Sequence, residues 1–425
     1  MTWLTPFKAC FGHRAQAVSL GHYVNGLFSD SPRKSMQAML ARVTAPPSYQ
    51  TVQHFITHAP WSARSMWQIL RAHLPERRGV LILDDTGFPK KGDHSVGVAR
   101  QYSGTLGKIG NCQVAVTAVL WTGVRAWLVG AALYLPKTWT DDPDRRRTAR
   151  IPADTVFREK WRLALELLRQ VRAAGLQITA VVADAGYGDV TVLRRVLHRL
   201  RLPYALGISS TLTVFRGTPE IHPPRAVRGP RQRRPRATLV HPEEAPVAVT
   251  TLVARLPAET WRVMTWRYGT NPPRAARCAA VRVTPAQDWK YGRLAPEVWL
   301  LCERPDDGAD EKYYFIHLPP DTPLAQLVAL AHQRWPIEQQ YQQLKTELGL
   351  DHFEGRTYPG WHHHVVLSAV AYAFLQCERM RREPTMTFEA IHAIVQEVFV
   401  GLLFATRPRY GTWLREARQL LPLRL

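Results

Sequence analysis

Three acidic residues, Asp85, Asp184 and Glu338, stand at positions where they could act together. Asp85 and its neighbour Asp84 follow the apolar run VLIL, and Asp184 follows the run ITAVVA, so each aspartate is expected to end a buried strand. If these strands were neighbours in one sheet, their carboxylates would be tolerated together only with cations between them. Oxygen-only ligands select Mg²⁺ or Mn²⁺ over zinc. The sequence therefore predicts a metal site, and two such ions could clamp a phosphodiester.

Glu338 lies in the first turn of a helix that is expected to begin near Pro336. The apolar residues of this helix recur at offsets of four, three and four, and they are Ile337, Tyr341, Leu344 and Leu348. Lys345 follows Glu338 by seven residues, so both lie on one face, about 10 Å apart along the axis. Taken singly, each acid has an ordinary explanation, a strand-end turn or a favourable helix dipole. Their joint occurrence and order favour a catalytic role.

The residues around Glu338 form the motif RWPIEQQYQQLK, in which three residues separate Arg334 from Glu338 and six separate Glu338 from Lys345. This spacing resembles the Y-R-E-K signature of bacterial cut-and-paste DDE transposases. Three further segments resemble insertion-sequence transposases of family 701, which are related to the family 4 group: LDDTGFPKKGDHSVGVARQYSGTLGKIGNCQ, VVADAGYGD and LGLDHFEGRTYPGWHHHVVLSAVAYAFL. The similar segments run from about Tyr23 to Leu375, which is most of the chain.

The resemblance implies a ribonuclease-H-like catalytic core and the cutting and joining of DNA with Mg²⁺ or Mn²⁺, with two ions in the site. Carried over position by position, the catalytic and metal-holding acids are Asp85, Asp184 and Glu338. Asp84 is the rival for the first position. Arg334 and Lys345 match the phosphate-contacting pair, whereas Ala331 stands where the signature has tyrosine. The implied partners are double-stranded DNA, as element ends and as target, and further copies of the chain on that DNA.

The charge balance of the 425-residue chain favours the same class of partner. Lysine and arginine outnumber aspartate and glutamate by 56 to 34, and the net charge of +22 favours a polyanion such as nucleic acid. With 46% apolar residues the chain can bury a full core, which excludes a disordered tail. We expect no signal peptide and no membrane partner. The five cysteines form no CxxC pair, which argues against structural zinc and fits a reducing, cytoplasmic compartment. The resemblance to bacterial transposases implies a prokaryotic protein associated with the nucleoid.

The order of expected elements predicts an α/β fold, which the resemblance refines to a ribonuclease-H-like core with an inserted β-rich domain and helical N- and C-terminal regions. The expected ranges are 1–75 for a helical N-terminal module with candidate DNA binding, 76–210 for the first part of the core, 211–310 for the basic β-rich insertion, 311–380 for the second part of the core with the catalytic-Glu helix, and 381–425 for C-terminal helices. QVAVTAVLW and RAWLVGAALYL are expected to form a hairpin, and Asp154 to cap a helix that stops at Gly175.

An arginine-rich segment lies in the expected insertion. Its six arginines, in a stretch without an acid, are Arg225, Arg228, Arg231, Arg233, Arg234 and Arg236. Pro230 and Pro235 interrupt it, so we expect an extended segment that neutralises DNA phosphates without reading bases. The alternative is a solvated loop with no partner. Trp335, next to Arg334, is a candidate for stacking on an unpaired base, although a buried core position explains it at least as well.

Two alternative functions stay open at this point. One is a non-catalytic, transposase-derived DNA-binding protein, against which the presence of all three acids argues, and the other is a metal-dependent nuclease that cuts without joining. The segment GTLGKI lacks the spacing and the Ser or Thr of a phosphate-binding loop, which excludes nucleotide hydrolysis. His362, His363 and His364 cannot all face one metal, and a solvated helix start is expected there.

Overall fold

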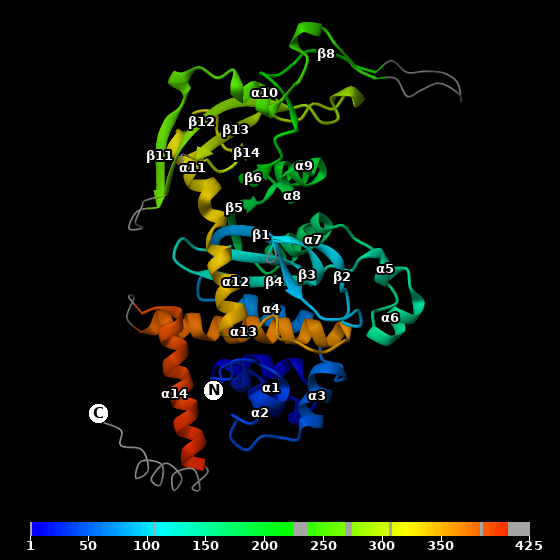
Figure 1. Ribbon diagram of the computed structural model, residues 1–425, viewed down its shortest axis with the longest axis vertical. Coiled ribbons are helices and arrows are strands. Elements are labelled where there is room, and N and C mark those ends of the chain that lie inside the picture. The colour runs from blue at the N-terminus through cyan, green and yellow to red at the C-terminus, as the bar shows by residue number, and fades with distance from the viewer. Residues whose placement is uncertain are drawn as a thin grey trace.

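A mixed β-sheet runs through the molecule, with helices along its faces and at one end (Figure 1). The computed structural model describes residues 2–104, 107–224, 236–267, 274–305, 308–382 and 386–406. Within this part of the chain, twelve strands belong to the large sheet and two short strands form a separate pair. The predicted α/β architecture is confirmed at this level.

The strands that carry the aspartates lie at the centre of the sheet. The central strands are β1 (Arg78–Pro89), β2 (Ala99–Ser103), β3 (Lys108–Trp121), β4 (Ala126–Leu133), β5 (Gln177–Ala183) and β6 (Tyr204–Ile208). β1 pairs antiparallel with β3 and parallel with β5, β5 pairs parallel with β6, and β3 also pairs with β2 and β4. β1 and β3 are buried over most of their length, as their apolar runs require. The expected hairpin of β3 and β4 is confirmed. The sequence left open whether the two aspartate strands are neighbours, and in the structure β1 and β5 pair directly.

β1 does not end at Asp84 and Asp85, as the sequence predicted, but continues to Pro89. The reason is its partner, because β3 has 14 residues and pairs with β1 as far as Pro89 opposite Cys112. This long ladder of backbone hydrogen bonds keeps residues of low strand propensity in an extended conformation. Both aspartates are therefore mid-strand residues, and their side chains point to opposite faces of the sheet.

The strands between Asp184 and Glu338 extend the same sheet beyond β6. They are β7 (Thr213–Phe215), β10 (Val247–Ala248), β11 (Arg262–Arg267), β12 (Arg274–Pro285), β13 (Val298–Pro305) and β14 (Lys312–His317). β14 pairs with β6 and is followed outward by β13, β12, β7 and β10, while β11 pairs with β12. β8 (Ile221–His222) and β9 (Thr238–Leu239) form the separate pair, and α10 (Val249–Ala254) follows β10. The β-rich stretch is thus joined to the central strands through β14 and β6.

Three of the N-terminal helices begin at serine caps, and three of them contact a long central helix. The N-terminal helices are η1 (Thr2–Leu4), η2 (Pro6–Cys10), α1 (Arg14–Leu27), α2 (Met36–Leu40), α3 (Tyr49–Thr57) and α4 (Ala63–His73). Ser35, Ser48 and Ser62 each accept a hydrogen bond from a backbone amide in the first turn of α2, α3 and α4. α1, α3 and α4 contact α13 (Tyr358–Arg381), which separates α1 and α3 from the sheet (Figure 1), whereas α4 lies on the sheet side of α13 and contacts β4.

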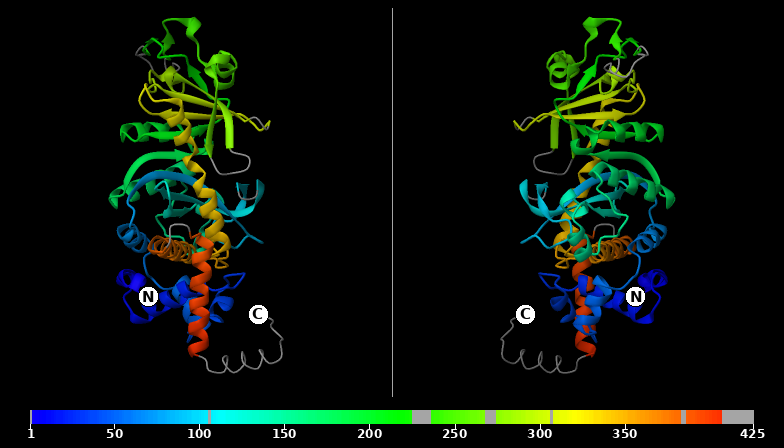
Figure 2. Two further views of the ribbon diagram at one scale, coloured as in Figure 1. Left: turned by 90° about the vertical axis from the view of Figure 1, so that its left-hand side faces the viewer. Right: turned by 90° about the vertical axis from the view of Figure 1, so that its right-hand side faces the viewer.

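The other helices complete both faces of the sheet. They are α5 (Lys137–Thr140), α6 (Pro143–Ala149), α7 (Lys160–Ala173), α8 (Ala185–Gly188), α9 (Thr191–Arg199), α11 (Leu324–Ala331), α12 (Pro336–Thr346) and α14 (Phe388–Thr406), with the 3₁₀ turns η3 (Pro242–Glu244), η4 (Ala258–Thr260), η5 (Trp289–Tyr291) and η6 (His332–Arg334). α12 begins at Pro336 as predicted. α7 begins at Lys160 and is not capped by Asp154, because Thr155 N–H donates to the Pro152 carbonyl in a turn before the helix. α14 runs beside the N-terminal helices (Figure 2), where Gln396 Nε2 donates to the Ser29 carbonyl and Phe399 stacks on Phe28. Of the helices described, none is both long and apolar enough to span a membrane.

Two of the three consecutive histidines at the start of α13 are buried, so the prediction of a solvated helix start is wrong. His363 and His364 are 3% and 1% exposed, because the N-terminal helices cover them. His363 is hydrogen-bonded to the carbonyls of Ile56 and Trp61 and stacks on the Trp61 ring at 3.6 Å. His364 is hydrogen-bonded to the Tyr23 hydroxyl at 2.8 Å. Burial lowers the pKa of His364 to about 4.

Acid is therefore expected to destabilise the protein between pH 6.5 and about 4. The His364 imidazole stays neutral in the folded chain down to its pKa of about 4, whereas in the unfolded chain it takes up a proton near 6.5. The unfolded state binds more protons in this window, so the free energy of unfolding falls as the pH drops, by roughly 3 kcal/mol for His364 alone. Urea unfolding at a series of pH values measures the fall, and His364→Gln should flatten it. Equal pH dependence in both proteins would contradict the assignment.

Candidate active site

Asp84 and Asp184 lie at the same level on neighbouring parallel strands. The register of β1 and β5 pairs Leu83 with Ala183, and the two aspartates are the next residues. Asp84 is 6% exposed, and burial raises the pKa of its carboxyl to about 7, with the charge of Asp184 acting in the same direction. Burial also raises the pKa of Asp184, whose Oδ1 is buried without a hydrogen-bond partner. Two carboxyls this close favour a cation between them.

Arg334 supplies that positive charge in this structure. Its Nη1 donates to Asp84 Oδ2 at 2.7 Å, and its Nη2 lies 3.5 Å from Glu338 Oε1. Burial by itself would lower the pKa of Arg334, but the charges of Asp84, Asp184 and Glu338 outweigh it and raise the pKa. η6 and the first turn of α12 place Arg334 and Glu338 four residues apart, on one face. The structure thus brings four charged residues together, Arg334 and the three acids Asp84, Asp184 and Glu338.

Asp85 has a different partner on the other face of β1. Its Oδ2 accepts a hydrogen bond from Lys160 Nζ, at the start of α7, at 2.5 Å. The charge of Asp85 still adds to the effect of burial in raising the pKa of Asp184, so it lies near that carboxyl. The sequence contains no signal that could identify Lys160, because it lies 75 residues from Asp85 and only the packing of α7 brings the two together.

α12 holds two further side chains against the sheet, one at β1 and one at β3. Lys345 Nζ donates to the carbonyl of Gly87 at 3.0 Å and lies 5.7 Å from the centre of the Phe88 ring. Burial lowers the pKa of Lys345. Tyr341 was predicted only as part of an apolar stripe, yet its hydroxyl lies 2.5 Å from Thr117 Oγ1 on β3. The predicted Lys345 is therefore held at the backbone of the strand that carries the first aspartates.

A cavity of about 640 Å³ opens beside Glu338. Its walls come from β3, β11, α11 and the start of α12, and they include Trp121, Met264, Trp266, His332, Trp335 and Glu338. Trp266 stacks on His332, with ring centroids 3.8 Å apart and planes 8° apart. Trp335 is 42% exposed, so the alternative of a buried tryptophan is wrong. An aromatic hollow of this size next to a carboxylate can take a planar base.

The arginine-rich segment falls largely outside the described residues. Arg225, Arg228, Arg231, Arg233 and Arg234 belong to the stretch 225–235, which the structure does not describe. Arg236 is described and is exposed. The expectation that this segment neutralises DNA phosphates stays a prediction.

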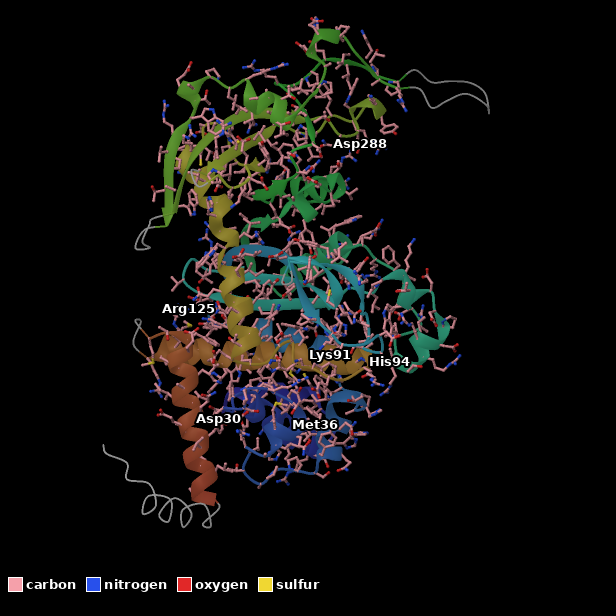
Figure 3. All side chains as sticks on the ribbon, in the orientation of Figure 1. Asp30, Met36, Lys91, His94, Arg125 and Asp288 are labelled. Atoms are coloured by element: carbon pink, nitrogen blue, oxygen red, sulfur yellow. The ribbon has the colours of Figure 1, made fainter. Side chains whose placement is uncertain are left out.

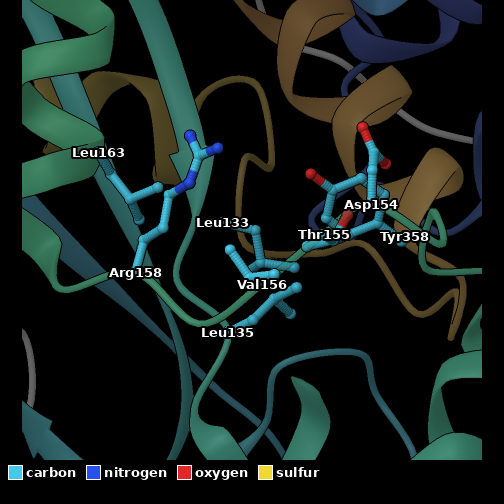
Figure 4. Close-up of a pocket in the computed structure, with 8 residues that line it drawn as sticks. All are labelled: Leu133, Leu135, Asp154, Thr155, Val156, Arg158, Leu163 and Tyr358. Carbon is cyan, nitrogen blue, oxygen red and sulfur yellow. The ribbon is translucent and has the colours of Figure 1, made fainter. Parts of the chain in front are cut away.

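A smaller cavity, of about 210 Å³, holds none of the predicted site residues. Figure 4 shows Asp154, Thr155 and Tyr358 together at one side of it, with Arg158 at the other and leucine side chains between them. Asp154, expected as a helix cap, therefore lines this cavity instead. We assign no chemistry to it.

The three acids offer the oxygen ligands that magnesium or manganese ions bind, although Arg334 lies among them in this structure. In the part of the chain that the structure describes, no three His, Cys, Asp or Glu side chains converge closely enough to hold an ion together. The oxygen-only donors and the buried, unpartnered Oδ1 of Asp184 nevertheless match the ligands that these hard cations take. An ion bound to Asp84 would have to displace the guanidinium that now occupies its Oδ2.

The sequence matches a known family over more than half of its length. Residues 6–273 match the model of the family described as DDE superfamily endonuclease. The chain belongs to this family. The stretch that matches the DDE endonuclease family contains Asp84, Asp85 and Asp184, and Glu338 lies beyond it.

A curated relative of this DDE family member is the probable transposase for insertion sequence element IS701 of Microchaete diplosiphon. The two sequences are 30% identical over 191 residues, which is 44% of this chain and 47% of the relative. The chain thus spans about half the length of the curated relative that it matches. The expected resemblance to insertion-sequence transposases of family 701 is confirmed. Among solved structures, the chain is similar to piggyBac transposase in a synaptic complex with hairpin DNA, with a TM-score of 0.44 and 9% identity over 97% of this chain and 77% of that one.

Proposed function

We propose that this member of the DDE endonuclease family is a transposase that cuts and joins DNA at insertion-sequence ends. The observation that carries the proposal is the gathering of Asp84, Asp184 and Glu338 around Arg334. These acids come from β1, the end of β5 and the start of α12, and acids that share one cation in this way suit metal-dependent phosphodiester chemistry. The family match and the IS701 relative support the same function.

The proposed catalytic core is ribonuclease-H-like. Its support is the strand order β4-β3-β1-β5-β6, in which β1 is antiparallel to β3 and parallel to β5. In this proposal, residues 76–210 and 311–380 form the core, and residues 211–310 form the basic β-rich insertion. Residues 1–75 and 381–425 add the helical regions, of which the first is a candidate for DNA binding.

Asp84, Asp184 and Glu338 would hold Mg²⁺ or Mn²⁺, with two ions as the expected complement. When bound, such ions activate water and stabilise the leaving oxygen of a phosphodiester. We place the first acid at Asp84 and not at Asp85, because Asp84 shares Arg334 with Glu338 while Asp85 is paired elsewhere. In this proposal the fold places Asp84 and Asp184 on neighbouring strands and links Glu338, on α12, to Asp84 through Arg334.

Arg334 would neutralise the acids before DNA arrives and then contact the scissile phosphate. A guanidinium can hold two phosphate oxygens at once, and its position beside Asp84 keeps it within reach of a group bound to the acids. Lys345, anchored at Gly87, would hold a neighbouring phosphate. These contacts align the phosphodiester for in-line displacement. Hydrolysis would free a 3′ hydroxyl, and that hydroxyl would then attack target DNA.

Double-stranded DNA is the proposed partner, as element ends and as target, and copies of the chain would assemble on it. Backbone phosphates would be neutralised by the arginine-rich segment, whose residues are Arg225, Arg228, Arg231, Arg233, Arg234 and Arg236. Trp335 would stack on an unpaired base at the cavity beside Glu338. We further propose that the protein acts in the cytoplasm of a prokaryote, associated with the nucleoid.

Cleavage of a labelled duplex that carries an element end and its flanking DNA tests the proposed function. We expect the purified chain to cut at the element end with Mg²⁺, joined products to appear when target DNA is added, and EDTA to stop both reactions. Cutting without joined products would favour the nuclease. Binding without cutting would favour the transposase-derived DNA-binding protein. Asp144→Asn, which changes an exposed acid of α6, is a matched control for the acid variants.

A further inference from the structure

The β2–β3 hairpin carries two large apolar side chains that face solvent. Tyr102 on β2 lies directly opposite Ile109 on β3, and the two residues are 61% and 60% exposed. Among the strands that the structure describes, β2 is the last at this edge of the sheet. A side chain added at Gly104 or Gly107 would meet nothing within 4 Å, so these two residues of the hairpin stand clear of the body. An opposed pair of this kind at a free edge is positioned to contact another molecule.

This pair lies on the same face of the sheet as Asp84. Asp84 is opposite Thr117 on β3, and side chains two residues apart on a strand share a face. Ile109 precedes Thr117 by eight residues and belongs to this set, and Tyr102 shares the face as its cross-strand partner. The hydroxyl contact between Thr117 and Tyr341 shows that α12 covers the same face. In Figures 1 and 2 the β2–β3 hairpin projects beside α12.

The charges around the hairpin are mainly positive. Arg100 is exposed on the same face as Tyr102, and Lys91 and Lys108 are exposed nearby in the chain. Asp93 is the single acid in the sequence from 90 to 111, and it is paired with His94 at 3.4 Å. Figure 3 places Lys91 and His94 close together, between α12 and α6. The apolar pair is thus bordered by cations, which suits a polyanion more than a second copy of this basic chain.

We propose that Tyr102 and Ile109 form an apolar wedge that enters the base stack of the DNA bound over the acids. The proposal rests on the proposed transposase function and adds a contact that bends or unstacks the substrate. Eight residues of β3 span about 27 Å, which is about eight base pairs of duplex, so the wedge acts at that distance from the cleaved bond. Proteins that insert apolar side chains between base steps kink the duplex and gain protein contact in return.

The test uses the full-length chain in EDTA, with 2-aminopurine placed in turn at about six to ten base pairs from the end of the element. Binding of the wild-type chain should raise the fluorescence at one of these positions at least about twofold, because the base loses its stacking. The double variant Tyr102→Ser with Ile109→Ser should bind the duplex within about threefold of wild type and leave the fluorescence flat. Both positions are exposed, so the variant keeps the core intact. Val124→Ser, at an exposed apolar site in the β3–β4 turn, is the matched control and should behave as wild type.

A second arm uses DNA with a mismatch at the responsive position and Mg²⁺ present. We expect the double variant to cleave fully paired DNA slowly and to regain its cleavage rate on the mismatched DNA. A mismatched base is already unstacked, so the wedge is no longer needed. A fluorescence rise that persists in the double variant would overturn the proposal. The proposal would also be overturned if the double variant gave the wild-type DNA response but had a different oligomeric state by light scattering. That result would mark the pair as a contact between copies of the chain. A wild-type chain that cuts element ends with flat fluorescence overturns the wedge alone, whereas one that does not cut also removes the proposed function.

Discussion

Asp84→Asn, Asp184→Asn and Glu338→Gln should each abolish strand cleavage, by at least about a thousandfold, while element ends bind as well as before or better. Each change keeps the size of the side chain and removes a charge that would hold metal. Tighter binding follows because one negative charge fewer faces the DNA phosphates. Single-turnover cleavage at saturating protein measures the first effect, and a binding assay in EDTA measures the second. Asp144→Asn should match wild type in both.

Asp85→Asn should be much milder and decides between the two aspartates of β1. It removes a partly exposed ion pair with Lys160, and such pairs contribute about 1 kcal/mol or less to stability. We expect cleavage to fall less than about tenfold, because the charge of Asp85 lies outside the contacts around Arg334. A loss larger than that of Asp84→Asn would reverse the assignment and return the first catalytic position to Asp85.

Arg334→Ala should give the largest loss of stability at the site, and the loss should grow with pH. In the folded chain the pKa of Asp84 is about 7, raised by burial and held down in part by Arg334, whereas an unfolded aspartate titrates near 3.9. The folded state binds more protons between these values, so stability from Asp84 falls as the pH rises through that window. Without Arg334 the pKa of Asp84 rises further and the fall continues to higher pH. Leaving a buried charge without its partner costs about 3–5 kcal/mol.

Urea unfolding at pH 5 and pH 8 measures this effect on wild type, Arg334→Ala, Arg334→Lys and the double variant Arg334→Ala with Asp84→Asn. The single alanine variant should be close to wild type at pH 5, where Asp84 is protonated in both, and strongly destabilised at pH 8. The double variant should recover at pH 8, because no buried charge is left at position 84, and the lysine variant should lie between. A loss in Arg334→Ala that is equal at both pH values would show that the guanidinium packs against the site without neutralising the acids.

Local patterns in the chain were enough to indicate the candidate acids and their order, but not to choose between Asp84 and Asp85. Two apolar runs that lead to aspartates and a helix with a first-turn Glu338 predicted the strands and the helix that carries the third acid, because buried strands and amphipathic helices impose their own residue periods. That the two strands are neighbours is shown only by the structure. The spacing of Arg334, Glu338 and Lys345 was enough to indicate the family. These are local properties, set within one element or by the chain order of elements.

Which partners these residues meet depends on how distant elements pack. Asp84 and Asp85 are adjacent in sequence and equivalent in chemistry, and they are separated by the long pairing of β1 with β3, which carries the strand past both and turns their side chains to opposite faces. Arg334 pairs with Asp84 on one face and Lys160 pairs with Asp85 on the other, and both partners come from elements far away in the chain. The buried histidines of α13 were missed for the same reason, because the polar residues of one helix do not show which other helices will cover them.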